Sequence, residues 1–450
     1  MNLSAWVERL FARPNQKLVV RTEVRAGIAT FLTLSYILFV NPSILSSAFP
    51  GGAAWIPQLM TTTALSAAVG CFLMAFLARY PFALAPGMGL NAYFSYTLIQ
   101  QQGIPWQAAL GAVLISGLFF TVISLTGLRE KVFTLFPRDL MHGTAAGIGL
   151  FLALIGCNHA GWVVAHPATL VGVGDFSQPA PLLALAGFLL MAVLHVRKVP
   201  GSILIGILAI TAASAFSGLP VFEGHALTQP RGGWIQWPVW PKDLFLQLDL
   251  SGALEVGMLG IVFSFLFVDF FDTAGTLVGL SSQAGLLDKN GQLPGARAAF
   301  TSDALATMVG ACLGTSTTTT YIESAAGIEE GGRTGLTAAI VGCCFLLCLF
   351  LWPLASIVPQ VATAPALILI GCFLMMGWGR IQWDQPATAI PAAITVITMP
   401  LTFSIATGIS FGIASYVLIN LLCGSFRKLN VWHYSLTVLI LLRFAYLQAG

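Results

Sequence analysis

Long apolar runs separated by short polar breaks fill almost the whole chain. A helix needs about 20 apolar residues to cross a bilayer, and a broken or re-entrant segment needs fewer. The pattern therefore predicts fourteen membrane spans, at 23–45, 57–79, 82–102, 105–127, 139–160, 180–196, 200–218, 252–282, 298–314, 315–329, 334–357, 363–379, 387–404 and 405–424. A further apolar segment, 430–447, contains Arg443 and is either another span or a helix at the membrane surface.

The longest polar stretch between spans, 219–250, divides the fourteen spans into seven and seven. We therefore predict a first repeat of seven segments and an external loop, followed by a second repeat and a short C-terminal part. The last part would contain a cytoplasmic turn and an apolar helix. The boundaries are 1–218, 219–250, 251–424 and 425–450.

Two of the spans lack the pattern of an ordinary helix. Residues 80–91, YPFALAPGMGLN, carry two prolines and two glycines, and residues 310–323, GACLGTSTTTTYIE, contain four consecutive threonines. Proline and β-branched residues favour extended backbone, so each stretch is expected to be an extended segment that leads into a half-helix. They fall in the third span of each half, and broken segments at matching positions are typical of the binding site of inverted-repeat transporters.

The basic residues predict the orientation in the membrane. With the N-terminus in the cytoplasm, only Arg231 and Lys242 fall outside, and Arg443 stays unassigned. The other basic residues then all flank spans on the cytoplasmic side, as the positive-inside rule requires. They are Arg9, Arg13, Lys17, Arg21, Arg25, Arg79, Arg129, Lys131, Arg138, Arg197, Lys198, Lys289, Arg297, Arg333, Arg380, Arg427 and Lys428.

The composition indicates that the protein lies in a lipid bilayer. Hydrophobic residues make up 57% of the chain and charged residues 8%, against roughly 25% charged residues in a soluble domain. The mean hydropathy is +0.86. The eight cysteines lie in apolar segments without a CxxC pair, which favours small buried hydrophobes over metal ligands or disulfides. The N-terminus is basic and lacks the features of a cleavable signal peptide.

Three acidic residues lie deep in apolar sequence, namely Asp269, Asp272 and Glu323, whereas Asp303 is expected at the membrane interface. A carboxylate deep in a membrane costs at least about 2.5 kcal/mol. No basic residue shares these spans, so each acid must be protonated, face water, or bind a cation or a hydrogen-bonding substrate. A single such acid could simply bond neighbouring helices. Three of them, one at a broken span and two sharing a helical face, favour a function.

Other polar positions carry weaker signals. Asn91 follows the extended stretch and is either a helix N-cap or a substrate ligand. The threonines 317–320 are expected to shape the backbone, although their hydroxyls could line a site. GGRTGLTA, 331–338, lacks the end of a phosphate loop, so we expect a tight turn with Thr334 capping span eleven. We predict neither an enzyme nor a metal or cofactor site, because no zinc, nucleotide or nucleophile–base pattern is present.

Five motifs resemble those of the AzgA-like purine permeases, a branch of the nucleobase:cation symporter-2 superfamily. They are RAGIATFLTLSYILFVNP (25–42), ALAPGMGLNAYFSY (83–96), FVDFFDTAGTLVG (267–279), GTSTTTTYIESAAGI (314–328) and GGRTGLTA (331–338). The resemblance implies an all-α polytopic membrane protein of fourteen segments in two inverted repeats of seven. It also implies a core domain of spans 1–4 and 8–11, a gate domain of spans 5–7 and 12–14, and short antiparallel strands in segments 3 and 10.

The resemblance also implies which residues bind substrate. The family's residues match Asn91 in GLNAY, Asp269 and Asp272 in DFFD, and Glu323 in YIES. Asp269 and Glu323 are the candidates for proton coupling. Residues expected to line the site are Thr276, Thr320 and Tyr321.

The function implied is proton symport of purine nucleobases across the inner (plasma) membrane, with guanine and hypoxanthine favoured and adenine also a candidate. The expected partners are a purine, a proton and the lipid bilayer, with a homodimer as an option and no nucleic acid. The alternatives are a sodium-coupled symporter and an anion carrier of the same fold. Unpaired acids without an intramembrane arginine argue against an anion.

The two acids in DFFD are expected to differ in role. Two carboxylates so close together do not both ionise easily in a low dielectric. We expect Asp269, which is surrounded by aromatic residues, to bind the purine or its proton. We expect Asp272 to tune affinity or the conformational step. A carboxylate can accept two adjacent N–H donors, as guanine presents.

Overall fold

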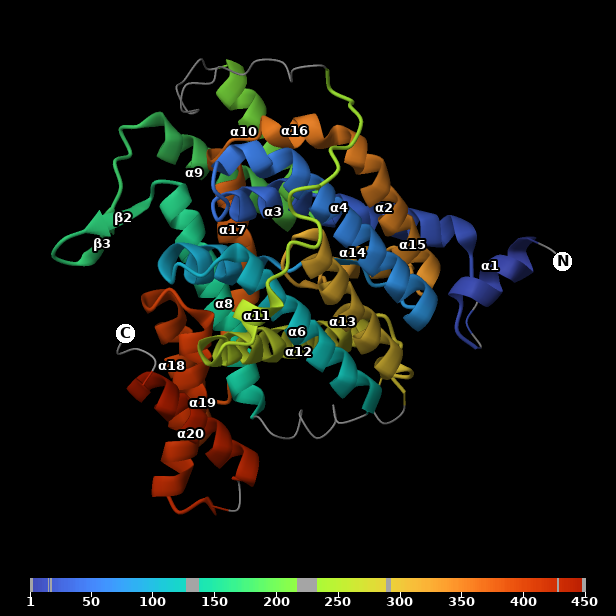
Figure 1. Cartoon of the computed structure of the whole chain (residues 1–450). Helices are drawn as coiled ribbons and strands as arrows, with labels where there is room; N and C mark the ends of the chain where they lie inside the picture. Colours follow the sequence, from blue (N-terminus) through green and yellow to red (C-terminus); the bar gives the residue numbers. More distant parts are fainter. Residues whose placement is uncertain are drawn as a thin grey trace.

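A computed structural model describes residues 3–14, 16, 18–126, 137–216, 233–288, 293–426 and 429–446. Figure 1 shows a bundle of helices whose first and second halves interleave, with α18, α19 and α20 gathered at one end. Several of the residues used to predict orientation lie outside the described residues. They are Lys17, Arg129, Lys131, Arg231, Lys289, Arg427 and Lys428.

The first half contains helices (α), short 3-10 or π-helical segments (η) and strands (β). They are α1 (Leu3–Phe11), α2 (Val20–Leu34), α3 (Ile37–Ser46), η1 (Gly52–Trp55), α4 (Ile56–Leu73), η2 (Met74–Ala78), β1 (Leu84–Pro86), α5 (Met88–Ala92), η3 (Tyr93–Gln101), α6 (Trp106–Thr126), α8 (Arg138–His159), β2 (Val163–His166), β3 (Leu170–Val173), α9 (Pro179–Val196) and α10 (Ser202–Phe216).

The second half contains the same three kinds of element. Its elements are α11 (Leu250–Ala253), α12 (Val256–Gln283), α13 (Ala296–Leu313), β4 (Thr318–Thr320), α14 (Ser324–Glu329), α15 (Gly335–Cys348), η4 (Leu349–Leu351), α16 (Trp352–Ser356), α17 (Gln360–Met375), η5 (Met376–Arg380), α18 (Pro386–Leu401), α19 (Ile405–Leu422) and α20 (Val431–Tyr446).

Within the described residues, nine helices are long and apolar enough to cross a membrane, and two shorter apolar helices lie at Ser202–Ala215 and Pro386–Leu401. The protein is therefore a mostly helical, multi-pass membrane protein. The three remaining predicted spans coincide with α13 and with the two broken segments. The number fourteen stays a prediction, as does the division into two repeats. Helix α20 lies within the predicted C-terminal segment 430–447.

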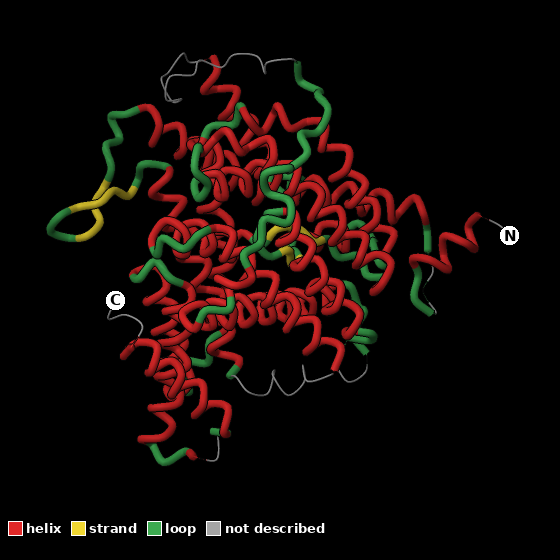
Figure 2. The backbone as a smooth tube through the Cα atoms, viewed as in Figure 1, coloured by secondary structure: helices red, strands yellow, loops and turns green. Residues whose placement is uncertain are grey.

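The two stretches predicted to be extended contain the strands β1 and β4. These strands pair antiparallel, with Leu84 opposite Thr320 and Pro86 opposite Thr318. Figure 2 shows this short ribbon in the middle of the helical bundle. Backbone groups inside a bilayer need hydrogen-bond partners, and each strand supplies them for the other. The pairing therefore brings the broken segments of both halves together at one place.

Close helix packing depends on small residues. Gly149 of α8 faces Gly371 of α17, and a Cβ atom added at either glycine would lie 2.6 Å from the carbonyl oxygen of the other. Small residues allow such an approach and are typical of membrane helix interfaces. At the turn 331–338, Thr334 is the N-cap of α15 and its hydroxyl accepts a hydrogen bond from the Leu336 N–H at 3.3 Å, which confirms the predicted cap.

Candidate functional site

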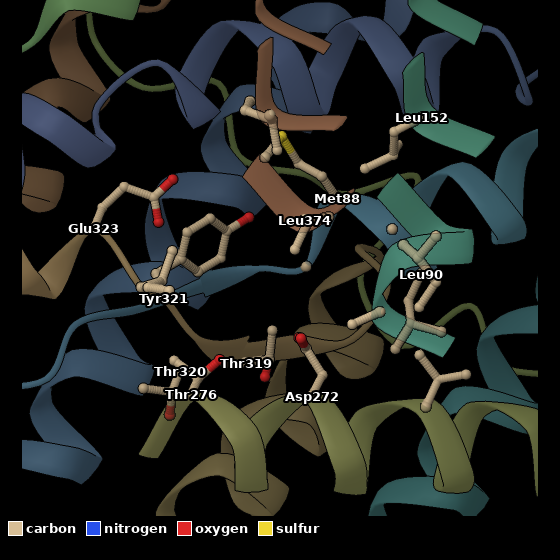
Figure 3. A pocket seen from close by; sticks show the side chains of 17 residues that line it. Met88, Leu90, Leu152, Asp272, Thr276, Thr319, Thr320, Tyr321, Glu323 and Leu374 are labelled. Atoms are coloured by element: carbon tan, nitrogen blue, oxygen red, sulfur yellow. The ribbon is translucent and has the colours of Figure 1, made fainter. Parts of the chain in front are cut away.

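A cavity of about 120 Å³ lies beside the paired strands. One wall comes from the strand-to-helix junctions 87–90 and 319–323 and from α12. The opposite wall comes from α8 and α17. The lining residues are Gly87, Met88, Gly89, Leu90, Ala145, Ile148, Leu152, Val268, Asp272, Thr276, Thr319, Thr320, Tyr321, Ile322, Glu323, Ile370 and Leu374. Five of the residues predicted from sequence thus meet at one place: Asp272, Thr276, Thr320, Tyr321 and Glu323 (Figure 3).

The chain turns from strand to helix at both junctions, and this presents backbone groups to the cavity. Gly87 is the N-cap of α5, and a Cβ atom there would lie 2.9 Å from the Thr319 side chain, so a larger residue would push the strands apart. The first N–H groups of a helix have no partner within the helix. Gly89 and Leu90 therefore offer donors at the cavity wall in addition to the side chains, whereas the Met88 N–H is directed at the Tyr321 hydroxyl oxygen.

Glu323 lies just before α14, and in the described part of the chain only one of its two carboxylate oxygens is held by a hydrogen bond. Its Oε1 accepts a hydrogen bond from the Tyr36 hydroxyl at 2.6 Å. Among the residues that the structure describes, its Oε2 has no hydrogen-bond partner. The carboxylate is half-buried and belongs to the cavity lining. Glu323 thus has one oxygen available for a ligand.

Asp272 extends from α12 toward the cavity, and Glu323 and Tyr321 lie on the other side of it (Figure 3). Within the described part of the chain, no side chain or backbone group donates a hydrogen bond to this carboxylate. Thr276 lies one turn further along the same helix and also lines the cavity. Both oxygens of Asp272 can therefore accept hydrogen bonds from a ligand.

Tyr321 and Thr320 shape the wall between these acids. The Tyr321 hydroxyl donates to the carbonyl oxygen of Pro86 at 2.5 Å and so ties the second broken segment to the first. Thr320 donates two hydrogen bonds, from its N–H and its hydroxyl, to Asp303, which lies behind the cavity wall. Both residues are predicted site-lining positions that the structure places in the lining.

Asp269, expected as the main ligand, does not line the cavity. It is fully buried, and its Oδ2 accepts a hydrogen bond from the Thr307 hydroxyl at 3.0 Å. Its Oδ1 has no hydrogen-bond partner among the described residues. Three residues along a helix amount to a rotation of about 300°, so Asp269 and Asp272 point about 60° apart. That difference directs Asp272 to the cavity and Asp269 to α13.

Asn91 also lies outside the cavity lining, contrary to expectation. It is fully buried within the first turns of α5, and its amide donates to Asn41 Oδ1. Asn41 in turn donates to Thr63 at 2.8 Å. The N-cap of α5 is Gly87 and not Asn91, so the alternative capping role is wrong as well. Asn91 joins the first broken segment to α3, behind the cavity wall.

Asp303, expected at the membrane interface, is fully buried inside the protein. Its carboxylate accepts hydrogen bonds from the Thr273 hydroxyl at 2.6 Å, and from the Thr320 N–H and hydroxyl at 2.8 Å each. Asp303 therefore ties α12 to strand β4. The signal in the sequence was Thr307, one turn later on the same face of α13, which marks a polar stripe in an apolar helix.

Replacement of Asp303 by alanine should destabilise the protein. The change would leave the Thr320 N–H and hydroxyl without their acceptor, at a cost of roughly 3 kcal/mol, whereas the Thr273 hydroxyl still has Thr319 Oγ1 at 2.9 Å. The measurement is the thermal unfolding midpoint of the purified protein in detergent. The control is Asp175→Ala, because Asp175 lies exposed in a loop. An Asp303→Ala midpoint equal to that of the control would contradict the structural role.

The cavity is suited to a small, partly apolar ligand that donates hydrogen bonds. Two carboxylates supply acceptors, helix-start amides supply donors, and Ile148, Leu152 and Ile370 supply apolar surface. The lining residues in the described part include no Lys, Arg or His. In that part, no three His, Cys, Asp or Glu side chains gather as metal ligands.

Comparisons with known proteins agree with this architecture. The model of the Permease family (Xan_ur_permease) matches residues 21–411. The transmembrane domain of the cyanobacterial bicarbonate transporter BicA superimposes with a TM-score of 0.61 at 16% identity, over 87% of this chain and 97% of that domain. At this identity the likeness concerns the fold alone.

Curated relatives match along almost the whole chain. A permease of Methanocaldococcus jannaschii is 46% identical over 98% of this chain and 99% of its own. The guanine/hypoxanthine permease PbuG of Bacillus subtilis is 42% identical, over 95% of this chain and 97% of its own. The adenine permease AdeQ of Escherichia coli is 40% identical, over 96% of this chain and 94% of its own.

Proposed function

Because the chain belongs to the nucleobase:cation symporter-2 family of permeases, we propose that it imports purine nucleobases by proton symport. The protein is a membrane transporter and not an enzyme. Guanine and hypoxanthine are the favoured substrates, and adenine is the next candidate. The proposed location is the inner (plasma) membrane with the N-terminus in the cytoplasm. A homodimer remains a prediction from the family resemblance.

The single observation that carries the proposal is the pair of carboxylates, Asp272 and Glu323, in a cavity without a basic residue among its described lining. The edge of a purine presents N–H donors, which carboxylates accept, and N or C=O acceptors, to which backbone amides can donate. The two free oxygens of Asp272 match two adjacent N–H groups, as guanine presents them. The apolar side chains of α8 and α17 suit the faces of a flat ring.

The walls of the cavity also support an alternating-access mechanism. One wall comes from segments assigned to the core domain, which include β1, β4 and α12, and the other from α8 and α17 of the proposed gate domain. Movement of one domain against the other would open the cavity to each side of the membrane in turn. We propose the full arrangement of two inverted seven-segment repeats on this basis.

Proton coupling requires a carboxyl group that can hold a proton during the cycle. Glu323 lies in the cavity, and Asp269 is buried behind it with one oxygen free of partners among the described residues. Neither has a basic residue beside it in its own segment. We propose that one or both of these acids carry the coupled proton, while Asp272 binds the purine.

Uptake of labelled hypoxanthine or guanine should depend on the proton gradient. Accumulation in whole cells or vesicles is expected to fall to the level of passive equilibration when a protonophore is added. Replacement of external sodium by choline should have no effect. Accumulation that survives the protonophore but requires sodium would instead establish the sodium-coupled alternative. Inhibition by a panel of unlabelled nucleobases would rank guanine, hypoxanthine and adenine.

The anion-carrier alternative has one supporting observation, the fold shared with a bicarbonate transporter. The chemistry of the cavity opposes it, because two carboxylates face the space that an anion would occupy. An anion would need a positive group there. Bicarbonate or sulfate should therefore not compete with purine uptake.

A further inference from the structure

Tyr36 lies at the junction of α2 and α3 and contacts the lining of the binding site. Helix α2 ends at Leu34 and α3 begins at Ile37, and Ser35 and Tyr36 between them keep right-handed helical dihedral angles, so the two helices form one continuous span. The Tyr36 side chain is fully buried. Its hydroxyl donates to Glu323 Oε1 at 2.6 Å, across the 287 residues that separate the two in sequence. The backbone carbonyl of Glu323 also accepts from Thr33 at 3.4 Å, one turn earlier.

The contact with Tyr36 makes the two cavity carboxylates unequal. One oxygen of Glu323 is engaged by a charge-assisted hydrogen bond, which is stronger than one between neutral groups. The other has no partner among the described residues. Asp272, by comparison, accepts no hydrogen bond on either oxygen within the described chain. Glu323 therefore offers a ligand one acceptor atom in a fixed direction, and Asp272 offers two.

We propose that Tyr36 is a positioning residue for substrate recognition. It holds the Glu323 carboxyl group so that Oε2 faces the cavity and Oε1 is withheld from the purine. This inference rests on the proposed function, since it concerns how the same site binds a nucleobase. It assigns recognition of two adjacent N–H donors to Asp272 and of a single N–H donor to Glu323.

A purely structural role for this hydroxyl would not need a partner in the cavity lining. A buried tyrosine hydroxyl needs a partner, and a backbone carbonyl is sufficient, as Tyr321 shows with Pro86. Tyr36 instead donates to a side chain that lines the cavity. A Glu side chain has three rotatable bonds, so without this partner its carboxyl group would sample several directions. Binding would then have to fix it anew for each substrate molecule.

The test is Tyr36→Phe, which removes one oxygen atom and keeps the ring. The measurements are KM and maximal rate of guanine and hypoxanthine uptake, normalised to the amount of protein in the membrane. We expect KM to rise about three- to tenfold, because binding must then order a Glu323 side chain that Tyr36 no longer holds, with a nearly unchanged maximal rate. The matched control is Tyr416→Phe, a buried tyrosine of α19 outside the cavity lining, which should keep the wild-type KM.

A second pair of variants tests whether Tyr36 acts through Glu323. Glu323→Asp withdraws the carboxyl group by one carbon from the Tyr36 hydroxyl and should itself raise KM. Tyr36→Phe added to Glu323→Asp should then raise KM little further, because the two residues act as a unit. Full additivity of the two changes would overturn the inference. If Tyr36→Phe does not reach the membrane, the test rests on Glu323→Asp alone. A wild-type KM in that variant would overturn the inference.

The outcomes separate this inference from the proposed function. A wild-type protein that takes up no purine would overturn both. A wild-type protein that takes up purines, together with a Tyr36→Phe variant of unchanged KM, would overturn the positioning role alone. A fall in maximal rate with unchanged KM would also overturn it, because that result would assign Tyr36 to the conformational step.

Discussion

Asp272→Asn is expected to reduce purine affinity by about a hundredfold. Asparagine keeps the shape of the side chain but replaces one acceptor oxygen by an N–H₂ group, which would face the N–H donors of the purine. The loss of one hydrogen bond to a charged group, together with the weakening of the other once the charge is removed, corresponds to about two factors of ten in affinity. The measurements are equilibrium binding of guanine to the purified protein and uptake in cells.

Asp269→Asn is the matched comparison for this prediction, because it makes the same change on the same helix, three residues away. Asp269 does not line the cavity, and an asparagine oxygen can still accept from Thr307. We expect affinity close to that of the wild type, with accumulation against the gradient impaired if Asp269 carries the proton. Loss of binding in Asp269→Asn with normal binding in Asp272→Asn would restore the assignment expected from sequence.

Glu323→Gln is expected to abolish transport while the protein still reaches the membrane. Glutamine keeps the length of the side chain but loses the negative charge and one strong acceptor. The Tyr36 hydroxyl could still donate to the amide oxygen, which would turn the amide N–H₂ group toward the ligand. A site that presents a donor to a donor rejects its substrate strongly, because both groups lose their partners on binding.

The Glu323 prediction is tested by binding and by exchange. Proton-coupled uptake and substrate exchange across the membrane should both be lost if Glu323 binds the purine. If Glu323 carried only the proton, Glu323→Gln would still bind purines and exchange them without a gradient. Wild-type affinity in this variant would therefore remove Glu323 from the substrate site and leave it only the coupling role.

Much of the architecture could be predicted from the sequence because membrane folding constrains local composition. Apolar runs of sufficient length mark the helices, and residues such as Pro86 and the threonines 317–320 mark the breaks. Thr334 as a helix cap and Glu323 in the cavity followed from their positions beside turns and extended segments. These features depend on residues close together in the chain, so a single sequence contains the information.

The predictions that changed concern buried polar side chains on regular helices. Asp269 and Asp272 were both expected in the site, but only Asp272 lines the cavity. Asn91 bonds to Asn41 instead of lining it, and Asp303 is buried between α12 and β4. A helix fixes the angle between its own side chains, but the sequence does not say which direction faces the cavity. That depends on how the helix rotates against its neighbours.

The sequence by itself determined that the chain lies in a membrane. It also determined the broken segments, the family resemblance and the set of intramembrane acids. Only the tertiary structure decided which acids line the cavity and which partner holds each of them. Tyr36 and Glu323 are 287 residues apart, and they meet because α14, which begins just after Glu323, packs against α2 in the folded bundle. A carboxyl group in lipid has an energy set by its nearest hydrogen-bond partners. Those partners come from distant segments, so the chemistry of each acid is a property of the assembled bundle.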